Sequence, residues 1–230
     1  MALVPLESNP DVMTKFVHKI GVPQKWSLHD VYGLDPELLA MVPKPALALI
    51  LLYPESEKAQ AYNAEVEAKI KEEGKEPPKN VFHMQQCVSN ACGTVALIHA
   101  ILNNLDHIDL EDGILKNFYE EAKDLSFIER GKLLVDAASG IIDTHKQLAQ
   151  EGQTAAPPEN EPVYHHFVAF VEKDGSLYEL DGCKSIPINH GSTTQETLLT
   201  DAAKICREYM ARDPDEVRFT MIALAANEQQ

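Results

Sequence analysis

Two cysteines, Cys87 and Cys92, lie five positions apart in the stretch QQCVSNACGTVALIHA, and their surroundings predict different reactivities. The apolar residues that follow predict a buried helix, with Ser89 and Asn90 as N-cap residues and Cys92 in the first turn. Backbone N–H groups and the helix dipole favour a thiolate there, and the thiolate is the form that attacks carbonyl carbons. Gly93 would leave room for a substrate backbone. Cys87 precedes the cap and gains none of these effects, so Cys92 is the candidate nucleophile. The alternative is that Cys92 is only a small buried thiol of the core.

A nucleophilic thiol needs a base, and the base needs a group that orients it. His165 and His166 open a predicted strand that is followed by an Asp-Gly turn and a second strand, SLYELDG. If the turn is a two-residue hairpin, His166 and Asp181 share one face as diagonal neighbours, about 7–8 Å apart at the backbone. A one-residue slip would exchange the two histidines. The register therefore predicts His166 as the base and Asp181 as its partner.

Acyl transfer places negative charge on a carbonyl oxygen, and hydrogen-bond donors must stabilise it. Gln86 lies six residues before Cys92, just outside the predicted helix, and its amide could act beside the Cys92 backbone N–H. Gln85 competes for this role. Cys92, His166, Asp181 and Gln86 together form a coherent set for a thiol hydrolase.

A metal site is the alternative chemistry for the same region. The residues that could take part are His165, His166, Cys183 and His190, but their spacing repeats no pattern typical of metal-binding proteins. We therefore expect no metal and no cofactor.

Helices and strands both recur along the chain, which predicts an α/β protein. Helices are predicted where cap residues precede apolar residues at helical spacing: residues 8–21, 35–39, 56–74 and 193–213. A capping box at residues 126–129 predicts the start of a further helix. Strands are predicted at residues 46–53, 167–173, 176–182, 185–189 and 217–225. The long apolar strands indicate a sheet that is covered on both faces.

The composition limits the class of partner and the cellular setting. The 20 Lys and Arg against 36 Asp and Glu give a net charge of −16, which would repel nucleic-acid phosphate and anionic lipid and attract a basic partner. The longest apolar run, residues 46–53, is too short to span a bilayer. The four cysteines form no CxxC pair, which favours a reducing, cytoplasmic setting. We expect one soluble domain over residues 1–230, without a nucleic-acid or membrane partner.

One segment, residues 145–163, has three prolines and no sustained periodicity. Its length predicts a long mobile loop of the kind that is often functional. A domain boundary is the alternative, but the strands after this segment need partners from before it.

Three motifs, QCVSNACGT, HHFVAF and LYELDG, resemble the ubiquitin carboxyl-terminal hydrolases, which are papain-like thiol deubiquitinases. The segments PLESNPDV, DVYGLDPELLAMVPKP, AQEGQT, PINHG and RDPDEVRF extend the resemblance to the small single-domain L-type members along nearly the whole chain. The resemblance implies an α+β fold with an antiparallel sheet between helical layers and a deeply knotted backbone. It also implies that residues 145–163 form a crossover loop that arches over the active site and limits the leaving group.

The resemblance also assigns roles to individual residues. Cys92 would be the nucleophile, His166 the general base, Asp181 its orienting carboxylate and Gln86 the oxyanion donor. This agrees with the hairpin argument in choosing His166 over His165, and it adds the choice of Gln86 over Gln85, which spacing alone leaves open.

The partner implied by the resemblance is ubiquitin. Four acidic residues fall where similar enzymes bind the arginine-bearing tail of ubiquitin: Glu7, Asp11, Asp30 and Glu216. The implied reaction is cleavage of small or unfolded adducts from the C-terminal glycine of ubiquitin by a monomeric enzyme. The alternatives are a ubiquitin-binding module without turnover and a hydrolase of another ubiquitin-like modifier.

Overall fold

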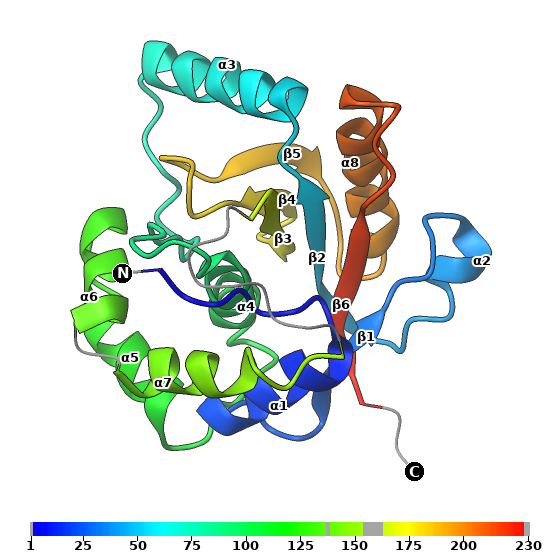
Figure 1. The fold of residues 1–230 in the computed structure, drawn as a ribbon. Coiled ribbons are helices and arrows are strands. Elements are labelled where there is room, and N and C mark those ends of the chain that lie inside the picture. The colour runs from blue at the N-terminus through cyan, green and yellow to red at the C-terminus, as the bar shows by residue number, and fades with distance from the viewer. Residues whose placement is uncertain (1, 137–138, 154–162, 228–230) are drawn as a thin grey trace.

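The computed structural model describes residues 2–136, 139–153 and 163–227 (Figure 1). These residues contain eight α-helices and one six-stranded sheet. In chain order the elements are α1 (Pro10–Ile20), β1 (Trp26–Asp30), α2 (Pro36–Leu39), β2 (Ala46–Pro54), α3 (Glu57–Glu73), α4 (Cys92–Leu102), α5 (Ile114–Ala122), α6 (Phe127–Asp136), α7 (Ser139–Leu148), β3 (His165–Lys173), β4 (Ser176–Leu180), β5 (Ile188–Ser192), α8 (Leu198–Arg212) and β6 (Thr220–Ala226). The predicted combination of helices with an antiparallel sheet is confirmed.

The sheet has the strand order β1-β6-β2-β3-β4-β5, and every neighbouring pair is antiparallel. The most C-terminal strand, β6, therefore lies inside the sheet, between β1 and β2. Strand β2 is apolar and buried along most of its length, as a strand covered on both faces must be. Strand β1, whose sequence WSLHD has only two apolar residues, was not predicted, and it forms an edge of the sheet beside β6.

Helices cover both faces of the sheet. Phe167, Ala169 and Val171 of β3 point to the face that packs against α4, whereas Val168 and Phe170 point to the face covered by α8. All eleven residues of α4 are buried, as the sequence predicts, and Figure 1 shows α4 surrounded by the sheet and helices α1, α5, α6 and α7. This packing places α4 directly against β3 of the sheet.

Most of the predicted element boundaries agree with the structure. The Asn9 side chain caps α1, Gly21 ends it with a φ of 116°, and Ser126 and Glu129 exchange capping hydrogen bonds at the start of α6. Strand β5 begins at Ile188, so the strand predicted at residues 185–189 is displaced toward the C-terminus. Helix α3 is confirmed, but only Ala59 of its apolar face is buried, because the helix stands at the edge of the fold (Figure 1).

The boundary predicted for the 145–163 loop is wrong at its first end. Residues 145–148 belong to α7. His145 is fully buried there and forms hydrogen bonds to two other segments of the chain. Its Nδ1 accepts a 2.7 Å hydrogen bond from the Thr94 hydroxyl, and its Nε2–H donates a 2.7 Å bond to the Val4 carbonyl. Residues 154–162 of the predicted loop lie outside the described residues. No described helix combines the length and the apolar character needed to cross a membrane.

Candidate active site

Cys92 is the first residue of α4, as predicted, but the cap before it differs from the prediction. The N-cap residue is Ala91, whose side chain cannot cap, and no cap hydrogen bond to this helix is found among the described residues. Asn90 takes a left-handed conformation with a φ of 65°, and its amide donates a 2.7 Å hydrogen bond to the Leu3 carbonyl. Ser89 and Asn90 are therefore not side-chain caps, and N–H groups of the first turn remain directed at the region around the Cys92 thiol.

The Cys92 side chain is 7% exposed and borders an apolar cavity of about 210 Å³. Leu6, Leu52 and Phe167 form much of its wall. The prediction that Gly93 leaves room for a substrate is wrong, because a Cβ at Gly93 would lie 3.3 Å from the Phe167 ring and 3.4 Å from Leu6 Cβ. Gly93 instead allows close packing of α4 against the sheet.

The predicted hairpin brings His166 and Asp181 together. Strands β3 and β4 pair Lys173 with Ser176 and Ala169 with Leu180, which is the register of a two-residue turn. The His166 Nε2–H donates a 2.7 Å hydrogen bond to Asp181 Oδ1, and both side chains are almost completely buried. His165 points to the opposite face and lines the cavity beside Cys92.

Burial and ion pairing oppose each other at His166 and Asp181. Burial alone would lower the pKa of His166, but the charge of Asp181 and hydrogen bonds with Asp181, Cys183 and Cys92 raise it well above its usual value. Burial would likewise raise the pKa of Asp181, but the charge and hydrogen bond of His166, followed by the charge of Lys184, lower it. The pair therefore favours a charged imidazolium beside the Cys92 thiol.

A second buried network of charged groups binds the carboxylate oxygen of Asp181 that does not face His166. Lys184 is 4% exposed, and its Nζ lies 3.2 Å from Asp181 Oδ2 and 2.7 Å from Glu179 Oε1. Glu179 also accepts hydrogen bonds from the Tyr209 hydroxyl at 2.6 Å and from His190 Nε2 at 2.8 Å. One ammonium group thus binds both carboxylates and fixes the second oxygen of Asp181.

Gln86 and Gln85 have different environments. The Gln86 amide donates one 3.2 Å hydrogen bond to the Val88 carbonyl, and an amide nitrogen has two hydrogens, so one is left for a further acceptor. Its Oε1 is buried and has no partner among the described residues. The Gln85 side-chain oxygen accepts from the Cys87 thiol at 3.7 Å, and its backbone N–H is bonded to the Phe127 carbonyl of α6. The backbone separates the two residues, because the Gln86 N–H donates a 2.9 Å hydrogen bond to the Gly182 carbonyl, next to Asp181, whereas Gln85 is bonded to α6.

His83 fixes the backbone of Asp181. Its Nε2–H donates a 2.8 Å hydrogen bond to the Asp181 carbonyl, and its ring packs between His99 and Phe127. Burial lowers the pKa of His83 to about 4. His83 is therefore neutral in the folded protein at neutral pH.

We expect His83→Gln to reduce the loss of stability in mild acid. Because the folded pKa of His83 lies below its unfolded value, its contribution is complete above the unfolded pKa of about 6.5 and is lost as the pH falls toward 4, by about 3 kcal/mol in total. Glutamine keeps a donor for the Asp181 carbonyl but does not titrate. Urea unfolding of both proteins at pH 7.5 and pH 5 checks this, and parallel losses in the two proteins would contradict it.

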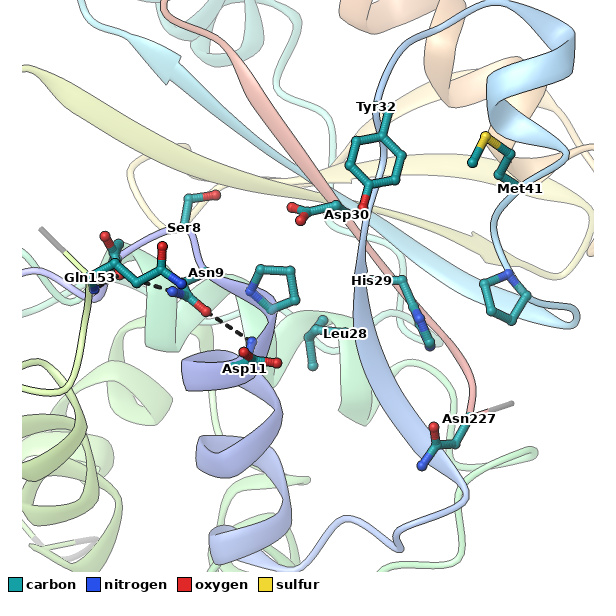
Figure 2. Close-up of a pocket in the computed structure, with 13 residues that line it drawn as sticks. Ser8, Asn9, Asp11, Leu28, His29, Asp30, Tyr32, Met41, Gln153 and Asn227 are labelled. Carbon is teal, nitrogen blue, oxygen red and sulfur yellow. Dashed lines mark hydrogen bonds between the residues drawn. The ribbon is translucent and has the colours of Figure 1, made fainter. Parts of the chain in front are cut away.

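Three of the four acidic residues predicted to bind a basic tail line one pocket of about 700 Å³. Figure 2 shows Asp11 at the start of α1 and Asp30 at the end of β1 beside Ser8, Asn9 and Tyr32; Glu7 also lines the pocket. Burial and the charge of Asp11 raise the pKa of Asp30. Glu216 is not among the described lining residues and forms a 2.6 Å ion pair with Arg218.

Comparison with known proteins identifies the family. Residues 3–211 match the family described as ubiquitin carboxyl-terminal hydrolase, family 1. The chain belongs to this family. It is 52% identical to a ubiquitin carboxyl-terminal hydrolase of Drosophila melanogaster over 98% of both chains, and 41% identical to isozyme L1 of Homo sapiens over 97% of this chain and 98% of that protein.

The fold also matches a solved structure. The Trichinella spiralis UCH37 catalytic domain, described as bound to ubiquitin vinyl methyl ester, superposes with a TM-score of 0.76 and 26% identity, over 99% of this chain and 97% of that chain. The protein is thus a ubiquitin carboxyl-terminal hydrolase, a cysteine peptidase with a single-domain α+β fold.

Sequence reasoning missed Lys184, Glu179 and His83 in this hydrolase. Buried lysine and glutamate are rare, so such residues are usually assigned to the surface when only the sequence is considered. The LYELDG motif placed Glu179 on the correct strand, but no sequence signal placed its partner Lys184 beneath Asp181.

We expect Gly182→Ala to displace Gln86 and lower the hydrolase's kcat. A Cβ at this position would lie 2.9 Å from Val95 Cγ1, 3.0 Å from Gln86 Cβ and 3.1 Å from the Gln86 backbone nitrogen. Such overpacking costs about 1–3 kcal/mol of stability, and a shift of catalytic geometry near 1 Å lowers rates by about 10²-fold. Gly113→Ala, where an added Cβ meets no atom of the described residues within 4 Å, is the control. Kinetics with a ubiquitin C-terminal amide and thermal unfolding test both, and equal rates for the two variants would contradict the prediction.

Proposed function

We propose that the enzyme releases small or unfolded adducts from the C-terminal glycine of ubiquitin through an acyl-enzyme on Cys92. The observation that carries this proposal is the buried His166–Asp181 pair, joined at 2.7 Å, with the Cys92 thiol among the groups that raise the pKa of His166. A relative whose structure is described as bound to ubiquitin vinyl methyl ester supports ubiquitin as the ligand.

The proposed reaction has two stages. The Cys92 thiolate attacks the glycine carbonyl, and the developing oxyanion accepts hydrogen bonds from the Gln86 amide and from N–H groups at the start of α4. The His166 imidazolium then protonates the leaving amine or thiol, and the C–N or C–S bond breaks. In the second stage neutral His166 takes a proton from water, and the oxygen of that water attacks the thioester carbonyl. The C–S bond then breaks, which releases ubiquitin and restores the Cys92 thiolate and the His166 imidazolium.

The acidic pocket is the proposed site for the arginine-bearing tail of ubiquitin. Glu7, Asp11 and Asp30 line it, and Tyr32 and Met41 expose apolar surface at its border, being 71% and 60% exposed. Glu216 remains a proposed contact outside this pocket, and it would have to share its carboxylate with Arg218.

The segment 145–163 is the proposed crossover loop, beginning after α7 rather than at residue 145. Support comes from the described residues that flank 154–162: Ala149, Gly152 and Val163 line the same cavity as Cys92. A loop at this place would exclude bulky leaving groups. We therefore expect slow cleavage of a folded ubiquitin dimer, and rapid cleavage would refute this part.

The test is reaction with ubiquitin that carries a C-terminal electrophile, followed by intact mass measurement. Wild type and Cys87→Ala should each gain one ubiquitin, and Cys92→Ala should gain none. If nothing reacts, titration with free ubiquitin identifies a binding module without turnover. Parallel kinetics with several ubiquitin-like modifiers would reveal a different preferred modifier.

The remaining proposals concern the whole molecule. We propose a papain-like arrangement with a knotted backbone, a monomer in solution, no metal or other cofactor in the reaction, and a cytoplasmic location without nucleic-acid or membrane partners. The four free cysteines and the net charge of −16 support a reducing compartment and a basic partner surface.

A further inference from the structure

Cys183 lies beside the His166–Asp181 pair, and no step of the proposed reaction uses it. One ligand atom from each of the three residues lies within 4.8 Å of the others. The backbone N–H of Cys183 donates a 2.8 Å hydrogen bond to Asp181 Oδ1, and its Sγ lies within 4.8 Å of a ring nitrogen of His166. His166 and Asp181 are buried, whereas Cys183 is exposed, so the thiol forms the solvent side of this cluster.

We propose that His166, Asp181 and Cys183 bind a thiophilic divalent cation of the zinc class. An imidazole nitrogen, a carboxylate oxygen and a thiolate are three ligand types that zinc accepts in tetrahedral sites. Zinc–ligand bonds of about 2.0–2.3 Å place ligand atoms about 3.5 Å apart. On binding, separations of up to 4.8 Å in the cluster would shorten, and the 2.7 Å between His166 Nε2 and Asp181 Oδ1 would widen by about 1 Å as the cation replaces the shared proton. The exposed side of Cys183 leaves the fourth position to water.

The charges around the cluster match a divalent cation. Glu179 and Asp181 carry two negative charges, Lys184 carries one positive charge, and a Cys183 thiolate adds a further negative charge. Lys184 binds Asp181 through Oδ2, whereas Oδ1 faces His166 and Cys183. The ammonium group and the metal therefore use different oxygens of the same carboxylate.

Metal binding would stop the proposed reaction. This inhibition rests on the proposed function, but binding of the metal itself does not depend on it. Binding releases the Cys183 thiol proton and the His166 proton that faces Asp181. The metal then holds the imidazole neutral at Nε2 and occupies Asp181, so His166 can no longer serve as the oriented imidazolium acid. The sequence suggested His166 and Cys183 as possible metal ligands together with His165 and His190, and the structure brings Asp181 to the first two instead.

Binding is tested with Co²⁺ on the Cys92→Ala protein, in which the other nearby thiol is absent. One equivalent of Co²⁺ should give a thiolate-to-cobalt charge-transfer band in the near ultraviolet. Adding Cys183→Ser should abolish the band, and adding Cys87→Ser, which removes the other exposed thiol, should leave it unchanged. A band that survives Cys183→Ser, or no band in the Cys92→Ala protein, would overturn the proposal.

Inhibition is tested with Zn²⁺ on enzymes that retain Cys92, each normalised to its own activity without metal. Cys183→Ser should raise the Zn²⁺ concentration for half-inhibition on the order of 10- to 100-fold. An unchanged value would assign inhibition to Cys92 and refute the inhibitory site. If wild type lacks turnover even without metal, the proposed function fails, while the Co²⁺ spectrum still decides the binding site.

Discussion

Asp181→Asn should lower kcat on the order of 10⁴-fold, with a much smaller change in KM. In comparable histidine-carboxylate pairs an amide supports the wrong imidazole tautomer and cannot stabilise the imidazolium. Here the carboxylate accepts the 2.7 Å hydrogen bond from His166 Nε2–H and supplies the charge that opposes the effect of burial on the His166 pKa. Steady-state hydrolysis of a ubiquitin C-terminal fluorogenic amide measures both constants.

The matched control is Asp174→Asn, in the turn of the same hairpin. Asp174 has a φ of 48°, a conformation that asparagine also adopts readily, so this variant should retain the wild-type kcat. A fall of less than tenfold for Asp181→Asn would contradict the role proposed for Asp181. Unfolding curves of both variants show whether lost activity reflects lost structure.

Lys184→Met should lower the free energy of unfolding by about 3–5 kcal/mol, because it leaves buried carboxylates without their shared counter-charge. Glu179 and Asp181 are 2% and 3% exposed, so water cannot replace the ammonium group. Burial opposes the charge of Lys184, but Glu179, Tyr209 and Asp181 together raise the pKa of this lysine above its usual value. Urea unfolding at pH 7.5 measures the loss.

Two further variants distinguish this network from an ordinary ion pair. Lys204→Met removes an exposed lysine that lies 2.8 Å from Asp201, and it should change stability by less than about 1 kcal/mol. Adding Glu179→Gln to Lys184→Met should recover part of the loss, since one buried charge is removed with its partner. Equal losses for Lys184→Met and Lys204→Met would show that burial of the network has no energetic consequence.

Sequence patterns predicted the parts of the site that local geometry controls. The Asp-Gly turn sets the β3–β4 register, so the proximity of His166 and Asp181 followed from counting residues. The position of Cys92 followed from the apolar residues of α4.

Features that depend on distant segments were not predictable in this way. Asn90 resembles a cap, but its amide bonds to Leu3 near the start of the chain instead. In the sequence Gly93 suggests space for a substrate beside Cys92. In the structure Phe167 of β3 occupies the space next to the Gly93 Cα. In the sequence Lys184 looks like a surface lysine. In the structure it lies buried between the sheet and α8, where it binds Glu179. In each case tertiary contacts determine the role.

The position of β6 in the middle of the sheet constrains synthesis of the protein. Strands β1 and β2 do not pair with each other, and each pairs with β6, which ends at Ala226. A nascent chain on the ribosome therefore exposes the apolar edge of β2 until residue 226 has left the exit tunnel. Such long-range pairing is slow and leaves unpaired strand edges open to aggregation. We expect the growing chain to need chaperones until β6 can pair with β1 and β2, and to acquire protease resistance only after that pairing.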